Sequence, residues 1–166
     1  MITPSRGDPD VRVKLSLLDR LWDDDPDAKS ERAPSRHQSI RMLKASVLRD
    51  MSALLNTKRR ETEVSAEFVE LRQSLLTFGL PDFTALSLRN PVEQNRLRRE
   101  VESTIRRFEP RLTSVTVHLE PRGEYDSGLR FRVDAQLKIE PEPEPVRFDT
   151  ILQADTCHFV VDSEDR

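Results

Sequence analysis

The sequence predicts an α+β fold in which helices pack on one face of a small antiparallel or mixed sheet of three to four strands. Apolar residues recur at helical spacings of three and four through the first two-thirds of the chain. From residue 112 onward they alternate with polar residues, which is typical of strands with one face in water. The 166 residues suit one compact domain, residues 36–154, with an N-terminal extension, residues 1–35, and a C-terminal strand extension and tail, residues 155–166.

The N-terminal extension contains a short amphipathic helix, predicted over residues 11–22, in which Leu15, Leu18 and Trp22 share one face. A helix of this length is marginal alone, so it must dock on a surface. Residues 23–36 are charged, broken by prolines and without periodicity, which indicates a flexible linker. We expect the three apolar side chains to bind a neighbouring chain; packing on the protein's own core is the alternative.

Two further helices are predicted between the linker and residue 80. The first starts at a capping box made by Ser35 and Gln38 and ends at Asn56, a residue that can adopt the left-handed conformation. Its inner stripe consists of Ile40, Leu43, Val47, Met51 and Leu54. The second is expected over residues 63–77, and Gly79 follows it as a stop signal. Its buried side would carry Val64, Phe68, Leu71 and Leu75.

A fourth helix begins after Asn90 and ends at a fixed point. Its apolar stripe consists of Leu97, Val101, Ile105 and Phe108. Pro110 keeps Glu109 out of the helical region, so the helix ends there and a strand follows. Glu109 and Arg111 are therefore held at a rigid corner. Two interpretations remain: an internal ion pair that secures the junction, or a recognition tip whose guanidinium binds a carboxylate or a helix end.

The remainder of the chain reads as sheet. Alternation predicts strands over residues 112–119, 129–139 and 146–152, with CHFVV as a continuation or a further strand. Ile151 interrupts the alternation, which leaves the register of the third strand open. The insert EPEPEP, residues 140–145, is acidic and proline-rich, so we expect an exposed connection.

The motifs of an enzyme or a metal site do not occur in this sequence. The 4 glycines do not cluster into a phosphate-binding loop, and the 3 histidines have no metal-ligand spacing. Cys157 is the single cysteine, so no internal disulfide can form and a reducing compartment fits. His158 is its neighbour, but adjacent side chains on a strand point to opposite faces and cannot form a catalytic pair. We therefore expect no catalytic residue, no metal and no cofactor.

Charge and hydropathy bound the choice of partners. The formal charge of −3 argues against a dedicated nucleic-acid binder. Residues 36–111 carry 15 basic and 10 acidic side chains, whereas residues 112–166 carry 6 and 12, which suggests complementary contacts within the molecule or with partners. No run approaches the roughly 20 apolar residues of a membrane span, and the N-terminus does not have the apolar core of a signal peptide. We expect a cytoplasmic protein without direct membrane insertion.

Four segments in a fixed order carry a family resemblance. They are SLLDRL, SVLRDMSALLNTKRR, LTFGLPDF and RRFEPRL, followed by alternating strands, and they span roughly residues 14–154. This order resembles the TssE family, a baseplate subunit of the bacterial type VI secretion system that is related to a wedge protein of contractile-tailed phage baseplates. The family is sometimes labelled lysozyme-like, but no motif found here supports hydrolysis. The resemblance implies a structural protein that binds the wedge subunits TssF and TssG.

The resemblance also implies two sets of site residues. The family's Glu-Pro-Arg motif falls on Glu109, Pro110 and Arg111 and is taken to grip the wedge. The contractile sheath proteins TssB and TssC are thought to dock by strand addition to an exposed sheet edge. We expect that edge within residues 129–154. Its residues would be Val146, Phe148, Thr150 and Leu152. Other baseplate subunits are further candidate partners, and the alternatives are a peptidoglycan hydrolase and a nucleic-acid-binding module.

Overall fold

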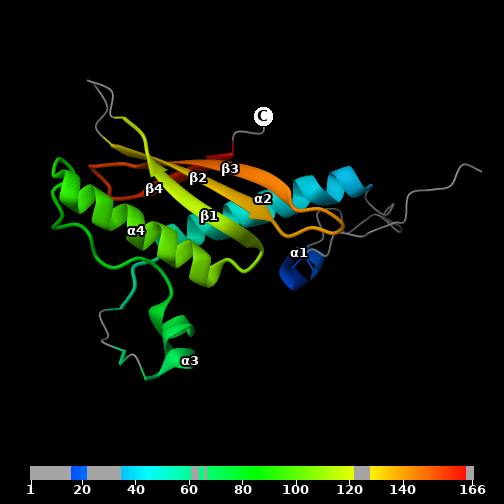
Figure 1. Ribbon diagram of the computed structural model, residues 1–166, viewed down its shortest axis with the longest axis horizontal. Coiled ribbons are helices and arrows are strands. Elements are labelled where there is room, and N and C mark those ends of the chain that lie inside the picture. Colours follow the sequence, from blue (N-terminus) through cyan, green and yellow to red (C-terminus); the bar gives the residue numbers. More distant parts are fainter. Residues whose placement is uncertain (1–15, 22–34, 61–63, 66, 122–127, 164–166) are drawn as a thin grey trace, which may run out of the picture.

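The computed structural model describes residues 16–21, 35–60, 64–65, 67–121 and 128–163. Within them, two long helices lie side by side against one face of a four-stranded sheet (Figure 1). The predicted α+β fold, with helices on one face of a small sheet, is confirmed. Among the helices of these residues, none combines the length and the hydropathy that a membrane span requires.

The sheet is an antiparallel meander in which each strand pairs with the next one along the chain. The order is β1-β2-β3-β4. The strands are β1 (Leu112–Leu119), β2 (Leu129–Leu137), β3 (Glu144–Leu152) and β4 (Phe159–Ser163). The last three residues of CHFVV thus begin a separate fourth strand. The expectation that Cys157 and His158 lie on a strand is wrong, because both precede β4 and Cys157 has a positive φ. On β3 the residues Val146, Phe148, Thr150 and Leu152 are buried, so Ile151 lies on the other face and the alternation is continuous.

The core lies between the inner face of the sheet and the helices α2 (Arg36–Asn56) and α4 (Pro91–Phe108). Each helix contributes a stripe at the predicted spacing, and the sheet contributes every second residue of its strands. The largest fully buried side chains include Met51, Leu97, Ile105, Phe131, Phe148 and Phe159. The opposite face of the sheet is charged, with ion pairs such as that between Arg147 and Asp134.

The two ends of α2 follow different rules. Its start has the predicted capping box, in which the Ser35 hydroxyl accepts from the Gln38 amide and the Gln38 side chain accepts from the Ser35 amide. The prediction of a left-handed Asn56 is wrong, because Asn56 is the last helical residue and Thr57 is an extended cap. The Asn56 side chain instead bonds to the backbone of Phe159 on β4.

The predicted helix over residues 63–77 is wrong. The chain forms one turn of helix, α3 (Val69–Arg72), and then a 3-10 turn, η1 (Leu75–Thr77). The Ser74 hydroxyl donates to the Leu71 carbonyl and accepts from the Leu76 amide, so it ends one turn and starts the next. This segment projects away from the two layers (Figure 1), and no surface formed by the described residues covers a helical stripe there.

Three of the four apolar residues expected on the buried side of that helix are consequently exposed, and Val64 is half-buried. Phe68, Leu71 and Leu75 are 56%, 41% and 85% exposed. The chain returns to the body at Gly79, whose φ of 95° suits glycine and where an added Cβ would lie 2.2 Å from the Thr57 carbonyl oxygen. The segment is therefore held at its base and open at its tip.

The N-terminal extension is described only around α1 (Leu17–Leu21). Leu15 and Trp22 lie outside the described residues, and so does the side chain of Leu18. The predicted docking face of this helix and the predicted domain boundaries therefore stay predictions.

Candidate functional site

The corner between α4 and β1 is closed by a buried ion pair. Glu109 is 4% exposed, and its Oε1 accepts from the Arg111 Nε at 2.7 Å and from the Arg111 amide at 3.1 Å. The Nη2 of Arg111 donates to the second carboxylate oxygen. Pro110 lies between them and is exposed. Of the two interpretations of the corner, the internal ion pair is thus present, with the forked geometry that makes Arg–carboxylate pairs strong.

Arg111 also connects the corner to the middle of α2. Its Nη2 donates to the Asp50 Oδ2 at 2.6 Å, and its Nη1 donates to the Ser46 Oγ at 3.0 Å. The hydrogen bond to Glu109 and then that to Asp50 raise the pKa of Arg111, and they outweigh the lowering effect of burial. The guanidinium is therefore held in its charged form by two different elements.

The same network reaches α1 through Asp19. Its Oδ2 accepts from the Ser46 hydroxyl at 2.7 Å, and its Oδ1 accepts from the Arg49 Nη2 at 2.8 Å. Burial alone would raise the pKa of Asp19, but hydrogen bonds from Ser16, Ser46 and Arg49 lower it well below its usual range. One continuous set of charged contacts thus joins α1, α2 and the corner.

Sequence reasoning missed the partners of the corner on α2. Ser46 and Asp50 lie one turn apart, and Ser46 is 3% exposed beside an apolar stripe. The available signal was the position of Ser46, a small polar residue on the buried side of a helix. A buried hydroxyl requires a hydrogen-bond partner, so this position indicates a polar contact. The wedge contact of Glu109, Pro110 and Arg111 itself stays a prediction.

The outer edge of β1 is covered by charged side chains of α4. Arg98 donates from Nη1 to the Val117 carbonyl at 3.0 Å, and Arg106 donates from Nε to the Val115 carbonyl at 3.0 Å. Glu102 lies between the two arginines, pairs with both, and accepts from the Val117 amide at 3.1 Å. The Val115 carbonyl and both backbone groups of Val117, with which a further strand would pair, are therefore occupied.

Among the described residues, the outer edge of β4 is bonded by another element only at its first residue. The Asn56 Oδ1 accepts from the Phe159 amide at 2.8 Å, and its Nδ2 donates to the Phe159 carbonyl at 2.8 Å. In an antiparallel ladder the outward-facing residues alternate, so the amides and carbonyls of Val161 and Ser163 face the same outer side. The Ser163 amide bonds to the neighbouring Asp162 carboxylate, and Val161 has no such cover among the described residues.

The expected edge position of β3 is wrong. Residues 148–152 pair with β2 on one side and with β4 on the other. Alternation along a strand shows which side chains are buried, but it does not show which strands are neighbours, and this is why the sequence misplaced the edge. An added strand could pair with Phe148, Thr150 and Leu152 only if β4 dissociated from β3. Val146 is paired with Ala135 of β2 and lies beyond the described end of β4. Strand addition itself stays a prediction.

Side chains for chemistry are not gathered at these sites. In the part of the chain that the structure describes, no group of three or more His, Cys, Asp or Glu residues could hold a metal ion. The charged groups at the corner and at the β1 edge are paired with one another or with backbone. Each carboxylate of the corner and of the β1 edge already has a cationic partner. These charged groups therefore suit a structural role, in which they connect elements of the fold or contact a partner.

One comparison with known proteins identifies a relationship. The sequence model of a family described as "Baseplate wedge protein gp25" matches residues 41–142. The matched stretch begins within α2, contains the corner and β1, and ends after β2. No curated protein matches the chain significantly, and no solved structure does.

Proposed function

Because the chain belongs to the baseplate wedge protein gp25 family, we propose that it is a non-enzymatic structural subunit of a type VI secretion baseplate, as its resemblance to the TssE family implies. The observation that carries this proposal is the family match over residues 41–142, which is most of the folded body. The proposed partners are the wedge subunits TssF and TssG and the sheath proteins TssB and TssC. The proposed place of action is the bacterial cytoplasm, at the baseplate.

The wedge contact is proposed at the surface around the corner. Pro110 is exposed there, the Arg111 side chain is 23% exposed, and the Arg49 side chain beside it is 58% exposed. Glu109 has both oxygens engaged by Arg111, so its role would be to position that guanidinium. A side chain that is held in place before binding loses less conformational entropy at an interface.

The test is co-purification of the tagged protein with a TssF–TssG complex. Glu109→Ala plus Arg111→Ala should lose association, but the pair is buried and the melting temperature should fall as well. Arg49→Ala removes an exposed group near the corner and is expected to weaken association with a small change in melting. Arg99→Ala, an exposed arginine of α4 outside the network, is the matched control.

The outcomes separate binding from folding. Weaker association of Arg49→Ala at unchanged melting, with Arg99→Ala equal to wild type, supports a wedge contact at the corner. If Arg49→Ala and the double variant both still co-purify with TssF–TssG, the corner serves only the fold and the wedge binds another surface of the protein.

The sheath contact is proposed at the open edge of β4. An added strand would find the outward amide and carbonyl of Val161, whereas the β1 edge is already occupied by α4. Val161→Pro removes that outward amide, and Val161→Ala retains it as the matched control. Fluorescent TssB should form sheaths in cells with Val161→Ala and few or none with Val161→Pro. Normal sheath formation with both variants would remove β4 from the proposal.

The lysozyme-like label supplies a direct counter-test. The purified protein should not clear a suspension of bacterial cell walls, because the carboxylates described at the corner and at the β1 edge are engaged in ion pairs. Clearing that persists in an independently purified preparation would overturn the structural assignment.

A further inference from the structure

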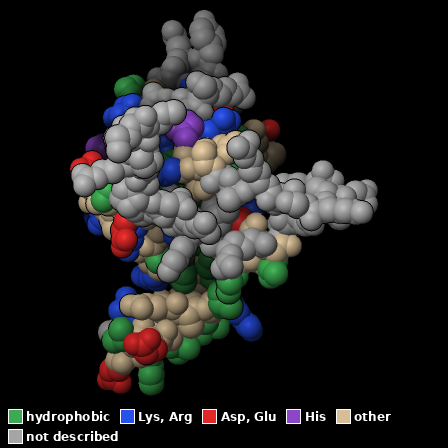
Figure 2. All heavy atoms as spheres, turned by 90° about the vertical axis from the view of Figure 1, so that its right-hand side faces the viewer, with side chains coloured by type: hydrophobic (Ala, Val, Ile, Leu, Met, Phe, Trp, Pro, Cys, Tyr) green, Lys and Arg blue, Asp and Glu red, His purple; other side chains and the backbone are tan. Residues whose placement is uncertain are grey.

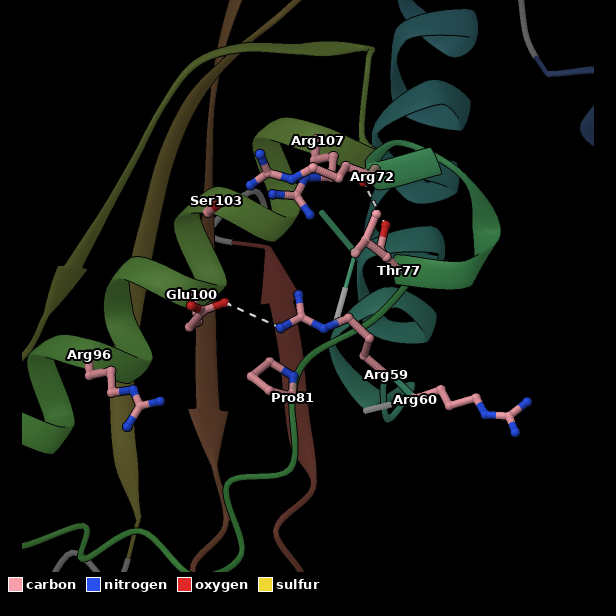
Figure 3. Close-up of a pocket in the computed structure, with 10 residues that line it drawn as sticks. Arg59, Arg60, Arg72, Thr77, Pro81, Arg96, Glu100, Ser103 and Arg107 are labelled. Atoms are coloured by element: carbon pink, nitrogen blue, oxygen red, sulfur yellow. Dashed lines mark hydrogen bonds and ion pairs between the residues drawn. The ribbon is translucent and has the colours of Figure 1, made fainter. Parts of the chain in front are cut away.

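An arginine-rich cleft lies between α4 and the α3–η1 segment, apart from the corner and from both sheet edges. Its volume is about 850 Å³. Five arginines and one carboxylate stand around it: Arg59, Arg60, Arg72, Arg96, Arg107 and Glu100. Figure 3 shows that Arg72 and Arg107 lie close together at one end, while Arg59 reaches toward Glu100.

Among the described residues, the positive charge of this cleft is largely uncompensated. Glu100 contacts Arg59 with an N–O distance of 4.0 Å. In the part of the chain that the structure describes, the side chains of Arg60, Arg72, Arg96 and Arg107 form no ion pair. Clustered like charges beside a low-dielectric surface create a strong local potential, which attracts a ligand of opposite charge.

One wall of the cleft is also apolar on its outer side. The α3–η1 segment contributes Arg72 and Thr77 to the cleft, and the same segment exposes Phe68, Val69 and Leu75 at 56%, 57% and 85%. Figure 2 shows hydrophobic side chains on this projecting lobe. Contiguous exposed apolar side chains beside charged groups are typical of a protein–protein contact.

We propose that the cleft and this lobe together dock an acidic amphipathic segment of a partner protein. Its carboxylates would bind the guanidinium groups, which have the planar fork that suits them. Its apolar side chains would cover Phe68, Leu71 and Leu75. The interaction does not depend on the baseplate assignment, because it follows from the charge and the exposed apolar area alone.

A nucleic acid fits this surface less well. Single strands are bound by stacking of bases on aromatic side chains along a basic groove. None of the described residues lining the cleft is aromatic. A phosphate backbone would also leave the apolar lobe uncovered.

The experiment is selection from a random 15-residue peptide library on the immobilised full chain. The probe variant is Arg72→Glu plus Arg96→Glu plus Arg107→Glu. The matched control is Arg41→Glu plus Arg89→Glu plus Arg99→Glu, three exposed arginines outside the cleft. Both are accepted for selection only if they melt as wild type does; Arg72→Gln plus Arg96→Gln replaces a probe variant that does not.

Wild type and the control should enrich peptides that combine Asp or Glu with Leu or Phe. The best of these, labelled and measured by fluorescence anisotropy, should bind the probe variant at least about tenfold more weakly, and binding should weaken with added salt. Phe68→Ser plus Leu75→Ser should reduce the apolar bias while the acidic bias remains.

Three results would overturn the proposal. The first is an enrichment without acidic bias, or one that the probe variant retains. The second is tighter binding of a 15-residue thymidine oligonucleotide than of the best peptide through the same arginines, which would make the cleft a nucleic-acid site. The third is a dimer in solution that Leu75→Ser dissolves, which would make a second copy of the chain the occupant of the lobe.

Discussion

The two edges of the sheet differ in how their backbone groups are covered. At β1, three charged side chains of α4 bond to the outward amide and carbonyls of Val115 and Val117. At β4, the single amide side chain of Asn56 bonds to Phe159, and the strand continues beyond it. An unpaired edge is a template for another strand. The difference favours β4 over β1 as the edge for the proposed strand addition.

The difference follows from how each helix meets its strand. α4 runs directly into β1 through the corner, so residues spaced four apart, Arg98, Glu102 and Arg106, lie along the strand's outer edge. α2 lies beside β4 from Asn56, its last helical residue, to Leu48, which lines a cavity with Ser163. Among the described residues, however, only its Asn56 side chain bonds to the outer backbone of β4. The covered length of each edge is therefore set by which side chains the neighbouring helix places against the strand.

The largest effect is expected from removal of the β1 cover. Glu102→Ala leaves the Val117 amide without its partner in a buried strand and takes the shared carboxylate from Arg98 and Arg106. The free energy of unfolding should fall by about 2–3 kcal/mol. Denaturant unfolding measures the loss, and hydrogen exchange of the Val117 amide should become faster.

The control for that variant lies on the same helix. The Glu100 carboxylate lies 4.0 Å from the Arg59 guanidinium, and its side chain is 39% exposed. Glu100→Ala should therefore lower the free energy of unfolding by less than about 1 kcal/mol. Equal losses for Glu100→Ala and Glu102→Ala would mean that the β1 cover contributes nothing beyond an ordinary surface charge.

Removal of the β4 cover should have the second largest effect. Asn56→Ala deletes the two hydrogen bonds to Phe159 but leaves the apolar contacts of that ring in place, so we expect a loss of about 1–2 kcal/mol. Exchange of the Phe159 amide should accelerate while that of Val117 does not. Asn95→Ala removes only a bond to the Pro91 carbonyl on an exposed helix face and is the matched control. Faster exchange at both edges would show that the covers are not independent.

Much of this architecture could be predicted from the sequence. The Ser35–Gln38 capping box predicts the start of α2, and Asn90 and Pro110 predict the two ends of α4. Alternation predicts three strands and their buried faces. These features are local, because each depends on residues within a few positions. The ion pair of Glu109 and Arg111 was also foreseen as one of two interpretations.

The sheet edges and the lobe could not be predicted, because each depends on what lies beside a segment in space. Alternation on β3 showed buried side chains but not the pairing with β4 that removes it from the edge. The spacing of Phe68, Leu71 and Leu75 resembles a buried helical stripe, although no surface among the described residues covers it. Asn56 readily adopts the left-handed conformation, but here its side chain bonds to the backbone of Phe159. Because Phe159 is far away in the sequence, local reasoning could not predict this contact.

A smaller effect is expected from closing the open part of the β4 edge. Val161→Pro removes an outward amide that the described residues do not engage, so the loss in the free energy of unfolding should be about 1 kcal/mol, mainly from the restricted φ. Val160→Pro removes an amide that faces β3 and should cost clearly more, about 3 kcal/mol. Thermal melting of the two variants gives the comparison, and equal losses would show that Val161 is not at an open edge.

The smallest effect is expected from salt, and it separates the two covers by their chemistry. Raising NaCl from 0.1 to 1 M shortens the Debye length from about 10 Å to about 3 Å, which weakens ion pairs but hardly changes a neutral amide bond. Arg98 and Arg106 have 25% and 56% exposed side chains, so their pairing with Glu102 is open to screening. Exchange of the Val117 amide should therefore accelerate about twofold relative to Phe159, as measured by NMR. Potassium fluoride at the same ionic strength controls for specific chloride binding. An equal change in the exchange rates of both amides would mean that the packing of α4 protects the β1 edge and that its charged groups contribute nothing to that protection.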